Sequence, residues 1–182
     1  SIIFNFVGAL ALLLWGMDLL SSGIQKGAGN KLQKLLSVVS GNRVTAVFTG
    51  LLVTGIIQSS SATTVMVVSF VNAQILSLTQ AIGIIFGANI GTTIDAVLSS
   101  IGASTNAKRA AAVHVGFNIC GTIIAIICFN PFLSLVDLFV PGTPESNITN
   151  HIAMLHTVFN ICSTLIFLPF VNQIAMLVSK LI

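Results

Sequence analysis

The sequence predicts an all-α, polytopic membrane protein with about four transmembrane helices, one re-entrant helical hairpin and one broken helix. Of its 182 residues, 55% are hydrophobic and 6% are charged, whereas a soluble domain has about 25% charged residues. The mean hydropathy is +1.05. At about 20 apolar residues per crossing, this length allows about four or five membrane segments and no separate soluble domain. We therefore expect residues 1–182 to form a single membrane domain.

The charged residues are few and dispersed. Seven Lys and Arg residues and four Asp and Glu residues give a net charge of +3. Nucleic-acid binding requires a clustered basic patch, so a nucleic-acid partner is excluded. The carboxylates lie far apart in the sequence, without a metal motif or an arrangement of Ser, His and Asp, so the chain is not expected to be an enzyme. The expected location is a cell membrane, as a multi-pass protein.

The first expected span covers residues 2–24, an apolar stretch with one charge. The chain changes character over residues 25–43, where Leu32, Leu35 and Leu36 share one helical stripe and the neighbouring lysines lie off it. This pattern is typical of a helix at the level of the lipid headgroups. We expect an interfacial helix there.

Residues 44–76 are interrupted by a polar cluster, residues 58–64, which reads Gln-Ser-Ser-Ser-Ala-Thr-Thr. The apolar arms on each side, residues 44–57 and 65–75, rise only about 16 to 21 Å as helices. A hydrocarbon core is about 30 Å thick, so neither arm crosses it alone. The segment is either a re-entrant hairpin with the cluster at its tip or one long helix that is unwound in the middle. We favour the hairpin.

A second polar cluster, residues 87–93, interrupts the next expected span, residues 77–103. Gly87 and Gly91 allow the backbone to leave helical geometry. Side-chain oxygens come from Asn89, Thr92 and Thr93. At such an interruption backbone amides and carbonyls also come free. We expect this span to be a broken helix.

Two further spans are expected at residues 108–130 and 150–179, with a loop between them that is marked by Pro131 and by residues 141–146. Both spans contain the pattern His-x-x-Phe-Asn-Ile-Cys-x-Thr, which begins at His114 in the first. It begins at His156 in the second. This repetition suggests duplicated helices.

The two polar clusters predict a binding site. Polar side chains at bilayer depth are tolerated where they are buried in protein or line a water-filled cavity. Alternatively, Ser, Thr and Asn side chains only join helices through hydrogen bonds. For Asn118 and Asn160 both interpretations stay open. For the clusters the site is favoured, because joining helices does not require interrupted ones.

The groups in these clusters indicate an anion that binds together with a cation. Helix N-termini after an interruption favour an anion, and hydroxyls donate to it. The segments contain no Lys or Arg, so cations must supply the compensating charge, and neutral oxygens suit a hard cation such as Na⁺. This chemistry predicts cation-coupled anion transport. Asp95, the one carboxylate of residues 44–107, is either a cation ligand or an interfacial residue.

The order of three motifs resembles the type II sodium-phosphate cotransporter family and its bacterial relatives. The motifs are residues 58–64, residues 87–93, and residues 114–118 after the basic pair Lys108 and Arg109. The resemblance covers nearly the whole chain. It implies secondary active transport of inorganic phosphate, coupled to Na⁺, by alternating access. A bacterial plasma membrane is the expected location.

The resemblance also implies roles for individual residues. Phosphate contacts are expected from Ser59, Ser60, Ser61 and Asn89, with Asn118 as a further candidate. Na⁺ ligands are expected from Gln58, Thr63, Thr64, Thr92 and Thr93, with Asp95 as a further candidate. No transition-metal site is expected.

One departure from the family matters for the assembly. The family carries the hairpin motif twice, in repeats of opposite orientation, and here it occurs once. We therefore expect half of an inverted-repeat transporter, which pairs with a second copy of itself or with a partner half, or is a fragment. If residues 44–76 form a hairpin, the basic residues divide four against three across the membrane. So weak a bias allows both insertions, and hence an antiparallel homodimer.

Two other functions use the same groups. The clusters can line an anion channel or pore instead of a transport site. A Na⁺-coupled transporter of another small oxyanion is also consistent with them. Accumulation of phosphate against its gradient separates a transporter from a pore.

Overall fold

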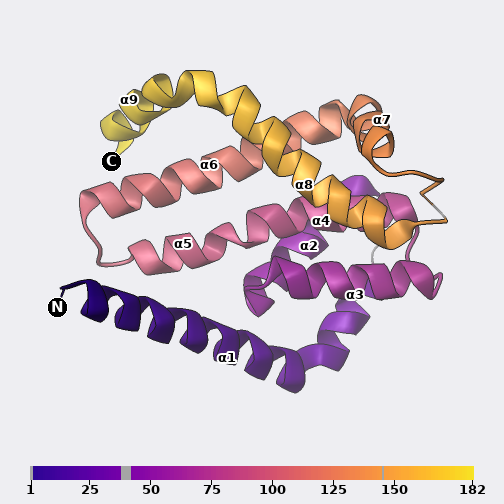
Figure 1. Ribbon diagram of the computed structural model, residues 1–182, viewed down its shortest axis with the longest axis horizontal. Coiled ribbons are helices and arrows are strands. Elements are labelled where there is room, and N and C mark those ends of the chain that lie inside the picture. Colours follow the sequence, from indigo (N-terminus) through magenta and orange to yellow (C-terminus); the bar gives the residue numbers. More distant parts are fainter. Residues whose placement is uncertain (1, 38–41, 145) are drawn as a thin grey trace.

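The computed structural model describes residues 2–37, 42–144 and 146–182. Within these ranges all regular structure is helical, so the prediction of an all-α chain is confirmed. The helices follow one another around a central helix, α4 (Figure 1). They are α1 (Ile2–Ser37), α2 (Arg43–Ile57), α3 (Ser60–Asn72), α4 (Leu78–Gly91), α5 (Thr93–Ser100), α6 (Thr105–Ile127), α7 (Phe129–Phe139), α8 (Ile148–Phe167), the 3₁₀ turn η1 (Leu168–Phe170) and α9 (Val171–Leu181).

Three helical stretches of the described chain are long and apolar enough to cross a membrane. They are Leu78–Ser100, Thr105–Ile127 and Ile148–Leu181. The three correspond to the expected spans at residues 77–103, 108–130 and 150–179. The fourth expected span, residues 2–24, lies within α1 and stays a prediction.

One helix, α1, occupies the place of two expected elements. It runs without interruption over Ile2–Ser37, past residue 25, where an interfacial helix was expected to begin. Its sequence contains no proline to stop it there. Residues 38–41, at the end of the expected interfacial helix, lie outside the described residues. The last turns of α1 bend towards α2 and α3 (Figure 1).

The polar cluster at residues 58–64 does separate two short helices, α2 and α3. Gln58 ends α2 in the left-handed conformation, with φ 57°, and its N–H donates to the carbonyl oxygen of Thr54. Ser59 then begins α3, because its side chain accepts a hydrogen bond of 3.2 Å from the N–H of Ala62. This is a helix N-cap that follows directly on a C-cap. The break is therefore sharp, two residues long, and lies where it was predicted.

The second break is smaller than predicted, and its glycines have another role. Gly87 and Gly91 are both helical residues of α4, and Thr92 alone, with helical φ and ψ of −64° and −20°, separates α4 from α5. The expectation that these glycines unwind the helix is wrong. A Cβ at Gly87 would overlap the carbonyl oxygen of Val47, and one at Gly91 would lie 2.7 Å from that of Leu51. Both positions require glycine because the backbones of α2 and α4 approach each other closely.

The expected loop between the last two spans contains a helix, α7, that was not predicted. Pro131 is the third residue of α7. Proline is tolerated in the first turn of a helix, where the N–H has no partner within the helix. Pro131 was therefore wrongly interpreted as a loop residue, whereas residues 141–144 are indeed irregular.

The last expected span, residues 150–179, is not one straight helix. The 3₁₀ turn η1 contains Pro169 and divides it into α8 and α9. Proline removes a backbone donor and clashes with the preceding turn, so a helix bends there. The chain changes direction after α8, and α9 turns towards α6 (Figure 1).

The core is centred on α4, where all residues from 81 to 89 are buried. The ring of Phe86 contacts the rings of Phe132 and Phe159, at centroid distances of 5.5 and 5.6 Å. These contacts join α7 and α8 to α4. The polar residue Asn89 lies one turn after Phe86, on a helix that also packs against α2 and α3.

Candidate functional site

Two buried hydroxyls join the helices on either side of the first break. Thr54 of α2 donates a hydrogen bond of 2.9 Å to the hydroxyl of Thr63 in α3. Thr63 in turn donates to the carbonyl oxygen of Ser59, at 3.2 Å. Both threonines have no exposed surface. The turn between α2 and α3 is therefore fixed from inside by a short chain of hydroxyls.

The same threonine contacts the end of α4, where the second cluster lies. A Cβ at Gly91 would be only 2.8 Å from the Cβ of Thr54 and 3.0 Å from the backbone nitrogen of Gly55. Thr54 thus lies between Thr63 and Gly91. The two polar clusters, separate in sequence, are neighbours through this one side chain.

The remaining predicted threonines use their hydrogens within their own helices. Thr64 donates to the carbonyl oxygen of Ser60 at 2.7 Å. Thr92 and Thr93 donate to carbonyl oxygens one turn earlier, at 2.8 and 2.7 Å. A hydroxyl whose hydrogen is used still has lone pairs to offer. These groups are suited to a cation and are poor donors to an anion.

Asn89 has the opposite property, a buried donor without an acceptor. Its side chain is 3% exposed, and its Nδ2 has no hydrogen-bond partner among the described residues. An unpaired buried donor costs stability and is rare in folded proteins. An anion bound beside Asn89 would therefore accept the hydrogen bond that the protein leaves unused.

Asn118 is also buried, with 5% of its surface exposed, and its Nδ2 donates to the carbonyl oxygen of His114 at 3.0 Å. One turn further along α6, Thr122 donates to the carbonyl oxygen of Phe86 in α4, at 3.4 Å. The short connection after α5 makes α6 antiparallel to α4. A residue one turn before Thr122 on α6 therefore lies at the same height as a residue one turn after Phe86 on α4. This register puts Asn118 at the level of Asn89.

The serines of the first cluster lie at the edge of this arrangement. Ser59 caps α3, Ser60 is half-buried and Ser61 is exposed, while Gln58 is half-buried at the turn. Among the described residues no hydrogen bond joins these side chains to Asn89. They surround the N-terminus of α3, whose first amides have no partner within the helix. The structure therefore gathers the threonines with the end of α4 and leaves the serines beside them.

Asp95 is half-buried in the first turn of α5. A carboxylate there interacts favourably with the free amides and the dipole of the helix. This position accounts for Asp95 without a bound cation. Its role as a cation ligand stays a prediction.

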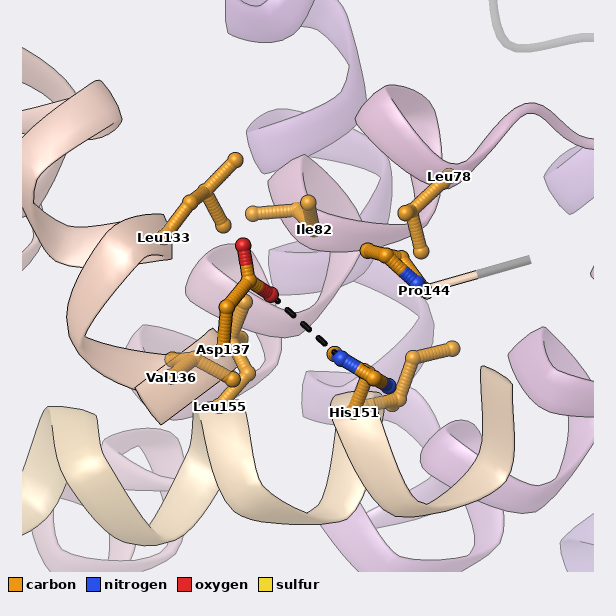
Figure 2. Close-up of a pocket in the computed structure, with 9 residues that line it drawn as sticks. Leu78, Ile82, Leu133, Val136, Asp137, Pro144, His151 and Leu155 are labelled. Carbon is orange, nitrogen blue, oxygen red and sulfur yellow. Dashed lines mark ion pairs between the residues drawn. The ribbon is translucent and has the colours of Figure 1, made fainter. Parts of the chain in front are cut away.

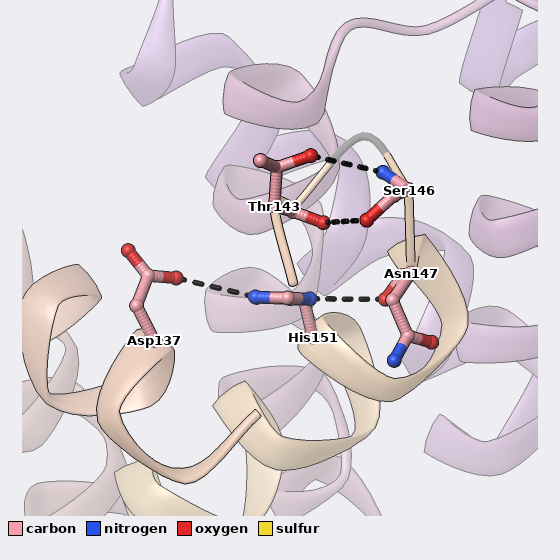
Figure 3. Close-up of polar contacts among 5 residues, drawn as sticks. All are labelled: Asp137, Thr143, Ser146, Asn147 and His151. Atoms are coloured by element: carbon pink, nitrogen blue, oxygen red, sulfur yellow. Dashed lines mark hydrogen bonds and ion pairs between the residues drawn. The ribbon is translucent and has the colours of Figure 1, made fainter. Parts of the chain in front are cut away.

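A separate polar contact, not predicted from the sequence, ties α7 to α8. His151 is 4% exposed, its Nε2 lies 3.4 Å from Oδ1 of Asp137, and its Nδ1 lies 3.0 Å from the carbonyl oxygen of Asn147 (Figure 3). A carbonyl oxygen only accepts, so Nδ1 carries a hydrogen. Nε2 makes no hydrogen bond among the described residues.

This ion pair borders a small apolar cavity of about 40 Å³ between α4, α7 and α8 (Figure 2). Leu78 and Ile82 line it from the first turns of α4. The distance along α4 from Ile82 to Asn89 is about 10 Å. The pair therefore lies apart from the polar clusters and belongs to the packing of α7 and α8.

Comparison with known protein families matches residues 12–177 to the Na⁺/Pi-cotransporter family. The matched region includes both polar clusters and α6. The chain belongs to this family. The resemblance seen in the sequence is thereby confirmed, and the Na⁺/Pi-cotransporter family is one of transporters and not of enzymes.

Several known proteins are similar to stretches of this chain. The uncharacterized protein YqeW of Bacillus subtilis (strain 168) is 37% identical over 102 residues, which is 56% of this chain and 32% of YqeW. The proposed inorganic phosphate export protein YjbB of Salmonella typhimurium is 37% identical over 90 residues, 50% of this chain and 17% of YjbB. The sodium-dependent phosphate transport protein 2A of Rattus norvegicus is 36% identical over 120 residues, 62% of this chain and 19% of that protein.

The chain thus spans a third or less of the length of these relatives, 17% to 32%. No solved structure matches it.

Sequence reasoning missed two residues of the site, Thr54 and Thr122. Thr54 lies one helical turn before Gln58, and Thr122 lies one turn after Asn118. A search for hydroxyls one turn away from each polar cluster would have found both. Thr54 lies inside an apolar run and was counted with it, whereas Thr122 was noted only as the last residue of the repeated pattern.

Proposed function

We propose that this chain is half of a secondary active transporter that moves inorganic phosphate coupled to Na⁺ by alternating access. Its membership of the Na⁺/Pi-cotransporter family supports this function. The observation that supports it most directly is the placement of Thr54, whose hydroxyl bonds to Thr63 while its Cβ packs against Gly91. One buried residue thus links the interruption at residues 58–64 to the second polar cluster. Buried polar groups at such interruptions are the usual construction of ion-coupled transport sites.

The threonine oxygens support the coupling to Na⁺. Their hydrogens are donated within the protein, so their lone pairs are what they can offer a ligand. Lone pairs of neutral oxygens suit a hard cation. We propose that the Na⁺ ligands come from these threonines together with one carboxamide and one carboxylate: Gln58, Thr63, Thr64, Thr92, Thr93 and Asp95.

The donors support phosphate as the anion. Asn89 offers an unpaired buried Nδ2, and the first amides of α3 point out of its N-terminus. With no Lys or Arg inside the clusters, Na⁺ supplies the charge that balances phosphate. We propose that phosphate is held by Ser59, Ser60, Ser61, Asn89 and Asn118.

The close packing of α2 against α4 suggests which parts move together. Gly50 and Gly87 allow the two backbones to touch along their length. Helices in such contact do not slide independently, because interiors pack at crystal density. We propose that α2 and α4 move together, and that the hairpin and the broken helix move against a scaffold made by the first and last expected spans during alternating access.

The chain needs a second half. We propose that it pairs with a second copy in antiparallel orientation, or with a separate partner half, in a bacterial plasma membrane. In this arrangement residues 2–24, 77–103, 108–130 and 150–179 cross the membrane, residues 44–76 form the re-entrant hairpin, and residues 25–43 lie at the interface.

The test is uptake of radiolabelled phosphate into proteoliposomes that contain the purified chain. An inward Na⁺ gradient should drive accumulation above the external concentration, and collapse of that gradient with a sodium ionophore should abolish it. Accumulation without a Na⁺ gradient contradicts the coupling. Simple equilibration indicates a pore, and stronger competition by arsenate or sulfate than by phosphate indicates another oxyanion.

A further inference from the structure

Three basic residues, from the start of α6 and the end of α9, lie at one end of the helical bundle. Arg109, near the start of α6, donates from Nη2 to the carbonyl oxygen of Ser179, in the last turn of α9, at 3.2 Å. Lys180 follows Ser179 directly, and Lys108 precedes Arg109. The fold thus brings two distant parts of the sequence together, and with them all three Lys and Arg residues beyond residue 44.

This basic cluster, Lys108, Arg109 and Lys180, contains a donor that lacks a hydrogen-bond acceptor. Nε of Arg109 is buried and has no hydrogen-bond partner among the described residues. The carboxylate of Asp137 pairs with His151, away from this cluster. A buried donor of a permanently charged group is costly unless an acceptor reaches it. The cluster therefore has the chemistry of a site for an anion.

An apolar groove leads away from the basic cluster between α6, the end of α8 and α9. Its volume is about 280 Å³. Val113 lines it from one turn after Arg109, and Ala175 lines it from one turn before Ser179. The groove therefore begins beside the cations and continues along Phe117 and Val171.

The exposed surface of α9 also indicates contact with lipid. Met176, Leu177 and Leu181 are more than half exposed, on a helix whose last turn contains Lys180. A lysine in the last turn of a membrane span typically reaches the level of the lipid headgroups. An anionic headgroup at the end of α9 would lie where the lipid phosphates are.

We propose that the groove between α6 and α9 binds an anionic phospholipid, with an acyl chain along Val113 and Ala175 and the headgroup phosphate at the basic cluster. Free phosphate would satisfy the cations but leave the groove empty. A zwitterionic lipid brings its own cation to a site that already has three. Basic pockets between membrane helices are known to suit anionic headgroups. This site differs from the proposed transport site and does not depend on it.

The test is native mass spectrometry of the purified chain, after titration with phosphatidylglycerol and, in parallel, with phosphatidylcholine. The chain should retain phosphatidylglycerol preferentially. Lys180→Gln should weaken retention about fivefold, and Arg109→Gln together with Lys180→Gln should weaken it further. The matched control is Lys31→Gln, which removes one exposed charge from α1 and should change nothing.

A second variant tests the groove and keeps all charges. Ala175→Phe should fill the groove and reduce phosphatidylglycerol retention while the chain elutes as before on gel filtration and melts at the same temperature. Equal retention in Lys180→Gln and Lys31→Gln overturns the proposal, as does unchanged retention in Ala175→Phe. Displacement of the lipid by millimolar inorganic phosphate would mean that the cations bind free phosphate instead. A disulfide between copies in Ala175→Cys, in a background without Cys120, Cys128 and Cys162, would mean that a second copy fills the groove.

Discussion

Thr54 and Thr63 share a hydrogen bond of 2.9 Å across the turn between α2 and α3, and neither side chain is exposed. A buried hydroxyl pair in the apolar core of a membrane protein requires a reason, because each hydroxyl must find a partner. Here the pair fixes the turn that carries the serines and contacts the end of α4 at Gly91. It is the structural link between the two halves of the proposed site.

Removal of the Thr54 hydroxyl should disturb the site more than the fold. Thr54→Val keeps the shape of the side chain and removes the bond to Thr63, which should lower the free energy of unfolding by about 1 kcal/mol. Because Thr63 is then held by one bond only, the affinity for Na⁺ should fall, as measured by the Na⁺ concentration that half-saturates phosphate binding. Thr54→Ser restores the hydroxyl and should recover both. Normal Na⁺ dependence in Thr54→Val would show that this bond serves stability alone.

Asn89 should be required for phosphate but not for stability. Its Nδ2 has no partner in the protein, so Asn89→Ala removes no hydrogen bond from the fold. The affinity for phosphate should fall about tenfold or more, the usual worth of a hydrogen bond to a charged group. Calorimetry measures the affinity and thermal unfolding measures the stability.

The matched control for Asn89→Ala is Asn160→Ala. Asn160 is exposed in α8, in the second copy of the repeated pattern. Its substitution by alanine should leave the affinity for phosphate unchanged. An Asn89→Ala variant that binds phosphate normally would remove Asn89 from the site.

The close approach of α2 and α4 predicts opposite effects for two glycine substitutions. A Cβ at Gly87 would overlap the carbonyl oxygen of Val47, so Gly87→Ala should destabilise the protein by about 1–3 kcal/mol. Gly116, inside α6, has nothing within 4 Å of its Cβ position. Gly116→Ala should stabilise the protein by about 0.5–1 kcal/mol. Thermal unfolding in detergent measures both, and equal effects would contradict the packing of α2 on α4.

Antiparallel pairing predicts that the connection between α5 and α6 lies on both sides of the membrane. Asn106, in the first turn of α6, lies directly after this connection. Asn106→Cys, in a background without Cys120, Cys128 and Cys162, should react in part with a membrane-impermeant maleimide in intact cells, and the remaining protein should react after the cells are opened. Labelling from one side only would exclude dual insertion and favour a separate partner half.

The helical class and the break at residues 58–64 could be predicted from the sequence, and both polar clusters could be identified in it, because these features follow from local patterns of apolar and polar residues. The sequence did not predict what depends on contacts. Gly87 was expected to unwind α4, and only the approach of α2 shows that it serves packing. Thr54 was counted with its apolar run until its bond to Thr63 appeared.

Two proline positions show the same limit. Pro131 was expected in a loop and begins a helix, whereas Pro169 bends an expected straight span into α8 and α9. Proline is compatible with the first turn of a helix and with a kink, and the sequence alone does not distinguish these from a loop. The gathering of Arg109 and Lys180 at one end depends on that bend.

The most direct measurement of the central claim is calorimetric titration of phosphate into the purified chain, in sodium chloride and in choline chloride of equal ionic strength. With neutral oxygens and no basic side chain in the clusters, phosphate should bind in sodium chloride and show no measurable heat of binding in choline chloride. Equal affinity in the two salts would contradict the claim that Na⁺ supplies the charge that holds the anion.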